Sequence, residues 1–135
     1  MALMAAGSLH ILLADDQPSV TQSVSIVLRY AGHHIESVTD GSDAFAQLTA
    51  KSADYDLLIT DHTMPTLTGL QLVAKLRTAK FTGKIIVLSA YLTSANEQAY
   101  HALGVDHILH KPFDVASLRT AVEQIAAALD AQRQP

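Results

Sequence analysis

The stretch DLLIT, from Asp56 to Thr60 and followed by Asp61, decides the fold of this chain. It is too short for a helix and too apolar for a strand that has one face in water. Such runs are typical of strands in a parallel sheet that is covered on both faces. Similar runs predict four more strands, two strong and two weaker, at Leu9 to Ala14, Lys84 to Ser89, His33 to Val38 and Asp106 to Leu109.

Helical stretches fill the gaps between the predicted strands. In the first of them, Val20, Val24 and Val27 recur at three- and four-residue steps, so one face turns toward a core. Pro18 opens this helix, which is a favoured position for proline. The last stretch has the same periodicity, and Asp114 precedes it as a predicted N-cap. The predicted helices are Pro18 to Tyr30, Ser42 to Ala50, Leu67 to Thr78, Ser94 to Leu103 and Val115 to Ala131.

Composition limits the class of protein. The chain has 135 residues, 49% hydrophobic and 16% charged, which suits one packed domain and excludes both a disordered tail and a membrane span. A net charge of -4 and a pI near 5.9 argue against direct nucleic-acid binding. Without cysteine, neither disulfides nor thiolate metal sites hold the fold. We expect a cytoplasmic domain without membrane contact over 9–131, after a disordered or expression-derived lead at 1–8 and before a frayed tail at 132–135.

Alternating strands and helices of these lengths predict right-handed βαβ units. The expected fold is α/β: a three-layer, doubly wound sheet of five parallel strands in the flavodoxin-like order 2-1-3-4-5, with five helices. In such a sheet, ligands bind beyond the carboxyl ends of the strands, where the strand order reverses. The functional residues are therefore expected at that edge.

Chemically active side chains follow the predicted strands at this edge. Asp15 and Asp16 come after the first strand, and Asp61 after the third. Ser89 ends the fourth strand, and Lys111 follows the fifth. Three carboxylates close together repel one another unless a cation holds them, and Mg²⁺ accepts carboxylate oxygens, carbonyls and waters. The pattern therefore predicts a Mg²⁺ site.

A carboxylate beside such a metal can attack phosphorus and form an aspartyl phosphate. Asp61 has the right position for this nucleophile. Lys111 would neutralise charge on the phosphoryl oxygens, and the hydroxyl of Ser89 would donate a hydrogen bond to one of them.

Four blocks of sequence, LLADDQP, LLITDHTMPTLTG, VLSA and HKPF, resemble the signatures of the two-component response-regulator receiver domain. The resemblance covers roughly Leu9 to Leu129, nearly the whole chain. Each block alone is a weak signal, but the set in this order is highly specific.

The resemblance implies a phosphorylation switch rather than an enzyme that turns over a substrate. Asp61 would accept a phosphoryl group from a histidine kinase or a histidine-containing phosphotransfer protein and pass the signal to an effector protein or domain. Its only catalysis would be Mg²⁺-dependent autophosphorylation and autodephosphorylation. Asp16 and Asp61 would bind Mg²⁺, and Asp15 would assist, partly through water.

The resemblance also assigns roles around the acceptor. The backbone carbonyl of Thr63 would complete the protein ligands of Mg²⁺. Lys111 would contact the phosphoryl group, Ser89 would swing toward it, and the peptide between Lys111 and Pro112 would be cis. Gly69 would let the loop after the acceptor turn into the third helix.

One position departs from the family pattern. Ile108 stands three residues before Lys111, where the family usually has an aromatic residue that rotates inward on phosphorylation. This puts the usual serine-to-aromatic coupling in doubt and leaves Tyr91 and His107 as the nearby alternative reporters. Tyr91 and Thr63 also occupy positions that tune dephosphorylation in the family.

Other interpretations of the sequence stay open. A pseudo-receiver that binds partners without phosphorylation fits Ile108, and the length allows either a free-standing receiver or a piece of a longer regulator. A flavin carrier fits poorly because two acids occupy the loop where a flavin phosphate needs donors. A haloacid-dehalogenase-type phosphatase would have DxD after the first strand. The fourth helix offers only Glu97 as a formal charge, which argues against a charge-mediated dimer.

The seven histidines lack a tight ligand spacing and are expected on the surface. His62 and His110 differ because they adjoin Asp61 and Lys111, where they would shape donor access or charge.

Overall fold

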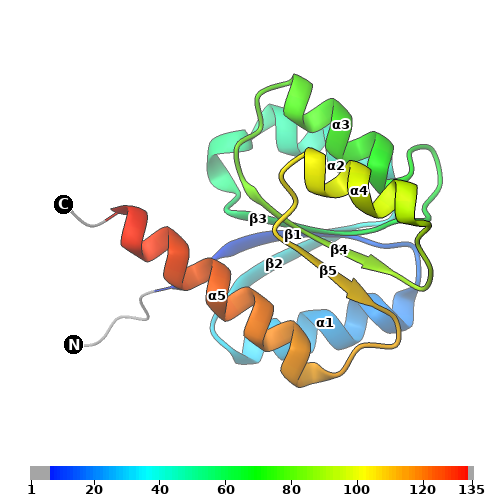
Figure 1. Ribbon diagram of the computed structural model, residues 1–135. Coiled ribbons are helices and arrows are strands. Elements are labelled where there is room, and N and C mark those ends of the chain that lie inside the picture. The colour runs from blue at the N-terminus through cyan, green and yellow to red at the C-terminus, as the bar shows by residue number, and fades with distance from the viewer. Residues whose placement is uncertain (1–6, 134–135) are drawn as a thin grey trace, which may run out of the picture.

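The computed structural model describes residues 7–133 and contains one parallel sheet of five strands (Figure 1). The strand order is β2-β1-β3-β4-β5, which confirms the predicted α/β fold and its order 2-1-3-4-5. The strands are β1 (His10–Ala14), β2 (His34–Val38), β3 (Leu57–Asp61), β4 (Lys84–Ser89) and β5 (His107–His110).

Helices cover both faces of the sheet, as the doubly wound fold requires. The helices α1 and α5 pack on one face, and α2, α3 and α4 on the other (Figure 1). Their bounds are α1 (Pro18–Tyr30), α2 (Gly41–Ala50), α3 (Gly69–Thr78), α4 (Ser94–Ala102) and α5 (Val115–Arg133), with a short 3-10 helix η1 (Ser52–Asp54) before β3.

The observed bounds agree with the predicted ones to within two residues. Helix α3 begins at Gly69 rather than Leu67 because Thr68 and Gln71 form a reciprocal capping box. Helix α5 runs to Arg133, two residues beyond the expected end. Residues 1–6 of the expected lead and residues 134–135 of the expected tail lie outside the described part of the chain.

The strands build two cores because successive side chains point to opposite faces. Ile11 and Leu13 of β1 face the core under α1 and α5, whereas Leu12 faces the core under α2, α3 and α4. Leu57 and Leu58 divide in the same way in β3. This accounts for the almost continuous apolar runs of β1, β3 and β4, whose residues are nearly all buried.

Local hydrogen bonds fix the ends of several helices. The Asp114 carboxylate accepts the backbone N–H of Ser117 at 2.7 Å, which confirms the predicted N-cap of α5. This bond lowers the pKa of Asp114. Thr93 caps α4 by accepting the N–H of Asn96 at 3.1 Å.

The guanidinium of Arg77 joins the far ends of three elements. From α3 it donates to the carbonyl of Leu103 at 2.9 Å and to that of Gly104 at 3.2 Å, just after α4. It also donates to the carbonyls of Phe81 at 2.9 Å and Gly83 at 3.1 Å, before β4. The rigid fork of arginine suits such a cluster of carbonyls, so this end of the sheet is tied together by one side chain.

The topology determines where a ligand can bind. The strand order reverses between β1 and β3, and the loops after β1, β3, β4 and β5 leave the same edge (Figure 1). No helix in the described part of the chain combines the length and the hydropathy that a membrane crossing needs.

Candidate functional site

Three aspartates meet at the carboxyl edge of β1 and β3. Asp15 and Asp16 follow β1, and Asp61 is the last residue of β3. One carboxylate oxygen of each lies within 4.8 Å of the others. Asp15 and Asp61 are buried and Asp16 is exposed, so the group opens to solvent on one side. The sequence predicted this convergence.

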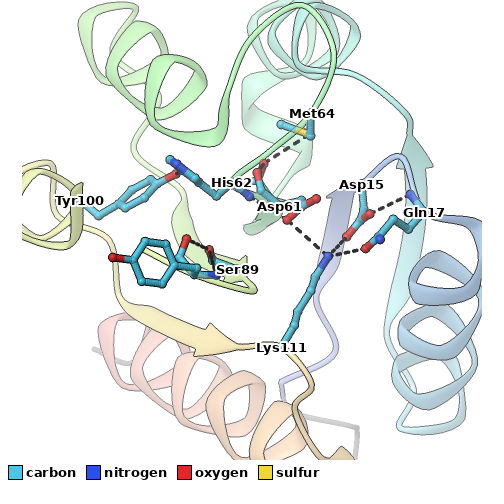
Figure 2. Close-up of polar contacts among 10 residues, drawn as sticks. Asp15, Gln17, Asp61, His62, Met64, Ser89, Tyr100 and Lys111 are labelled. Atoms are coloured by element: carbon cyan, nitrogen blue, oxygen red, sulfur yellow. Dashed lines mark hydrogen bonds and ion pairs between the residues drawn. The ribbon is translucent and has the colours of Figure 1, made fainter. Parts of the chain in front are cut away.

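Lys111 reaches into the acidic group from the loop after β5 (Figure 2). Its Nζ lies 3.1 Å from Oδ2 of Asp15 and 3.3 Å from Oδ1 of Asp61. It also donates to Oε1 of Gln17 at 2.8 Å. The peptide between Lys111 and Pro112 is cis, as the resemblance implied.

The charges at this edge do not balance. Burial raises the pKa of Asp61, and the negative charge of Asp15 raises it further, against the opposing effect of Lys111. Among residues 7–133, three carboxylates face one ammonium group, so the edge carries excess negative charge. An all-oxygen donor set with this excess fits a hard divalent cation such as Mg²⁺, and Asp15, Asp16 and Asp61 are the side chains to hold it.

A cleft of about 920 Å³ opens over the acidic group. Polar and apolar side chains both line this cleft, and it is open to solvent, so a partner's side chain can approach Asp61. The lining residues that belong to the predicted site are Asp16, Asp61, Thr63, Ser89 and Lys111, and the apolar ones are Val20, Ala90, Tyr91, Pro112 and Phe113.

The hydroxyl of Ser89, the last residue of β4, is bonded to the backbone of the loop that follows. It donates to the carbonyl of Tyr91 at 2.8 Å and accepts the N–H of Tyr91 at 3.1 Å (Figure 2). The side chain of Tyr91 is 75% exposed. Ser89 and Asp61 both line the cleft. The backbone of the loop after β4 holds the hydroxyl of Ser89. Thr63 is exposed and also lines the cleft.

His62 connects the acceptor carboxylate to the helix layer. Its backbone N–H lies 2.9 Å from Oδ1 of Asp61 and 3.0 Å from the carbonyl of Leu88. Its ring Nδ1 forms a hydrogen bond with the hydroxyl of Tyr100, which comes from α4 (Figure 2). Tyr100 is completely buried, and burial raises its pKa strongly, as does the charge of Asp61.

Gly69 makes this arrangement possible. A Cβ added at Gly69 would lie 2.5 Å from the carbonyl oxygen of Asp61, 2.7 Å from the hydroxyl of Tyr100 and 3.0 Å from Cα of His62. The backbone of α3 therefore approaches the acceptor more closely than any side chain allows.

Residues 11–123 match the family model described as "response regulator receiver domain". The chain belongs to this family. Among curated relatives, the response regulator RppA of Synechocystis is 34% identical over 110 residues, which are 82% of this chain and 47% of that protein. The sensor protein EvgS of Escherichia coli is 32% identical over 87% of this chain and 10% of that protein. The receiver domain thus spans less than half the length of these relatives.

Solved structures agree with this assignment. The chemotaxis response regulator CheY4 of Vibrio cholerae is 30% identical and has a TM-score of 0.77, over 87% of this chain and 98% of that one. The N-terminal domain of an uncharacterized protein from Wolinella succinogenes shares the fold, with a TM-score of 0.85 at 24% identity over 93% of this chain and 100% of that one.

Within this receiver domain, Ile108 is half-buried on the face covered by α2, α3 and α4. It packs against the core that contains Tyr100. His107 is half-buried, and His110 is exposed at the end of β5. Ile108, which departs from the family pattern, thus lies in this half-buried position, and its effect on switching stays a prediction.

Sequence reasoning missed two partners of the site. Gln17 was not singled out, yet it bonds Lys111, and its own N–H donates to Asp15 at 2.9 Å. Tyr100 was also missed. The only signal was a large aromatic residue in the otherwise small and polar segment SANEQAYHAL, which is typical of a buried anchor.

Proposed function

We propose that this receiver domain is a signalling switch that accepts a phosphoryl group on Asp61 with Mg²⁺. The observation that carries the proposal is the buried contact of Lys111 with Asp61 and Asp15 at the floor of an open cleft. The phosphoryl donor would be a histidine kinase or a histidine phosphotransfer protein, and the partner downstream an effector protein or domain in the cytoplasm.

Asp61 would act as the nucleophile. Lys111 and the N–H of His62 both contact Oδ1, so we assign the attack on phosphorus to Oδ2. The new bond joins Oδ2 to phosphorus, the phosphorus–nitrogen bond of the donor histidine breaks, and its electron pair returns to the imidazole. Mg²⁺ bound by Asp16, Asp61 and the Thr63 carbonyl, with Asp15 assisting, would neutralise charge on the phosphoryl oxygens.

Lys111 and Ser89 would receive the phosphoryl group. The ammonium group of Lys111 already lies in the acidic group and would pair with a phosphoryl oxygen. The hydroxyl of Ser89 would have to leave the carbonyl of Tyr91 to donate to another oxygen. Phosphorylation would therefore compete directly with the present conformation of the loop after β4.

Incubation with acetyl phosphate and Mg²⁺ tests the proposal. Intact mass spectrometry should find one added phosphoryl group, which should disappear in Asp61→Asn and after chelation of the metal. The matched control Asp54→Asn removes an exposed carboxylate and should label like the wild type. Labelling that persists in Asp61→Asn would contradict the assignment. A wild type that takes up no phosphoryl group would favour the phosphorylation-independent binding module instead.

A further inference from the structure

Tyr100 is an unusual anchor for α4. It is the largest of the fully buried side chains in the described part of the chain, and its ring packs in the core under α2, α3 and α4. A buried phenol needs a partner for its hydroxyl. That partner is Nδ1 of His62, and the two rings meet edge to face with centroids 5.6 Å apart.

The backbone of His62 in turn makes three hydrogen-bond contacts, one with a carboxylate oxygen and two with other backbone groups. Its N–H contacts Oδ1 of Asp61 and the carbonyl of Leu88. Its carbonyl accepts the N–H of Gly69 at 2.7 Å. A change at the carboxylate of Asp61 therefore alters a hydrogen bond of His62, whose ring is bonded to α4.

Other routes from the acceptor to α4 have weaker polar connections. The hydroxyl of Ser89 bonds the backbone of its own loop, and Ile108 has no polar side-chain atom. Between residues 7 and 133, the bond of Tyr100 is the hydrogen bond that joins an α4 side chain to the loop after β3.

We infer that Tyr100 is a positioning residue whose hydroxyl transmits the phosphorylation state of Asp61 to α4 through His62. This rests on the proposed function, since it needs a phosphorylated state to transmit. The added charge and bulk at Asp61 shift the backbone of His62, its ring moves or releases Tyr100, and α4 changes its packing. In this domain the aromatic residue that responds to phosphorylation is Tyr100 on α4, because β5 has Ile108 where the family usually has an aromatic residue.

The test compares Tyr100→Phe with the wild type and with Tyr30→Phe. The first variant keeps the ring and removes the hydroxyl, whereas the control removes the hydroxyl of Tyr30 on α1, a residue that is 91% exposed. Each protein is treated with acetyl phosphate and Mg²⁺, and its phosphorylation is checked by intact mass. Hydrogen exchange of residues 62–68 and 94–102 is then measured by mass spectrometry.

In the wild type and in Tyr30→Phe, phosphorylation should change amide exchange in both segments. In Tyr100→Phe, Asp61 should still be phosphorylated and segment 62–68 should still respond, with loss of the response in 94–102. His62→Ala breaks the same bond from its other side and should lose the same response. If Tyr100→Phe does not fold, the response of His62→Ala tests the inference in its place.

The outcomes separate the two proposals. If phosphorylated Tyr100→Phe responds in α4 as the wild type does, the inference is wrong and the proposed function stands. If phosphorylated wild type shows no change in α4, the inference is likewise wrong. If the wild type takes up no phosphoryl group, the proposed function fails and the inference fails with it.

Discussion

Removing the charge of Asp61 is expected to stabilise the unphosphorylated fold. The carboxylate is buried at the end of β3, within 4.8 Å of oxygens of Asp15 and Asp16. Asn keeps the shape of the side chain and the oxygen that accepts the N–H of His62. The substitution Asp61→Asn therefore isolates the energetic consequence of holding this charge.

The size of the effect follows from opposing contributions. At an effective dielectric constant of about 20, two unit charges 4.8 Å apart repel by about 3.5 kcal/mol, so Asp61 and Asp15, whose oxygens lie within that distance, repel by at least about this much. Lys111, at 3.3 Å, attracts by about 5 kcal/mol on the same scale. Taking a carboxylate out of water costs several kcal/mol more, which tips the balance against the charge. We expect Asp61→Asn to raise the free energy of unfolding by about 1 to 2 kcal/mol.

The difference in stability between the wild type and Asp61→Asn should depend on pH. The pKa of Asp61 is raised in the folded state, so the folded protein keeps this proton to higher pH than the unfolded chain does. Stability that depends on the protonated carboxyl is complete below the unfolded value near 3.8 and is lost as pH rises through the folded value. The advantage of the Asn variant should therefore be largest at neutral pH and disappear in acid.

Urea unfolding followed by circular dichroism, in chelator-treated buffer, measures the difference. Asp54→Asn, at an exposed carboxylate, should change stability by less than about 0.5 kcal/mol. Added Mg²⁺ should narrow the gap between wild type and Asp61→Asn, since a cation bound to the wild type stabilises it. If the Asn variant is no more stable than the wild type at neutral pH, the pair with Lys111 outweighs burial and the reasoning is refuted.

Three further predictions address stability. Gly69→Ala should lower the free energy of unfolding by about 1 to 3 kcal/mol, because its Cβ would lie 2.5 Å from the carbonyl oxygen of Asp61. Arg77→Lys should lower it by about 2 kcal/mol, since an ammonium cannot keep all the carbonyl contacts of the guanidinium. Urea titrations measure both. Burial lowers the pKa of His33, whose Nδ1 accepts the N–H of Leu9 at 3.0 Å. His33 therefore binds a proton at higher pH in the unfolded chain than in the folded protein. The free energy of unfolding should fall as pH drops below about 6.5. His33→Asn, which stays neutral, should reduce that fall in a pH series of unfolding midpoints.

Each of these has a contrary result. An alanine at position 69 that leaves stability unchanged would mean that the loop after β3 relaxes freely. A lysine at position 77 that costs less than about 0.5 kcal/mol would mean that water replaces the lost contacts. An unchanged acid response in His33→Asn would assign that response to other groups.

The sequence was sufficient for the sheet and its acidic edge because both depend on local patterns. The apolar run before Asp61 indicates a buried strand, and the acids directly after β1 and at the end of β3 mark its carboxyl edge. Helix starts were less exact where two signals compete. Leu67 extended the apolar pattern of α3, but the reciprocal cap of Thr68 and Gln71 sets the actual start at Gly69.

Pairings across the fold could not be predicted. Gln17 and Lys111 are 94 residues apart, and His62 and Tyr100 are 38 apart. Nothing in the local sequence specifies which polar side chain meets which across such separations. The bonds of the Ser89 hydroxyl to the backbone of Tyr91 are likewise not specified by residue type and position alone.

The contacts of Arg77 limit how α4 can move. They hold the helix just past its C-terminal end, at Leu103 and Gly104, whereas its first turn near Ser94 follows the loop that connects it to Ser89 at the end of β4. A tilt of α4 about this held end would displace its residues more the closer they lie to Ser94. At about 1.5 Å of rise per residue, a tilt of about 10° over its length moves the free end by about 2 Å. A small rotation at the held end thus becomes a side-chain-sized shift beside the cleft.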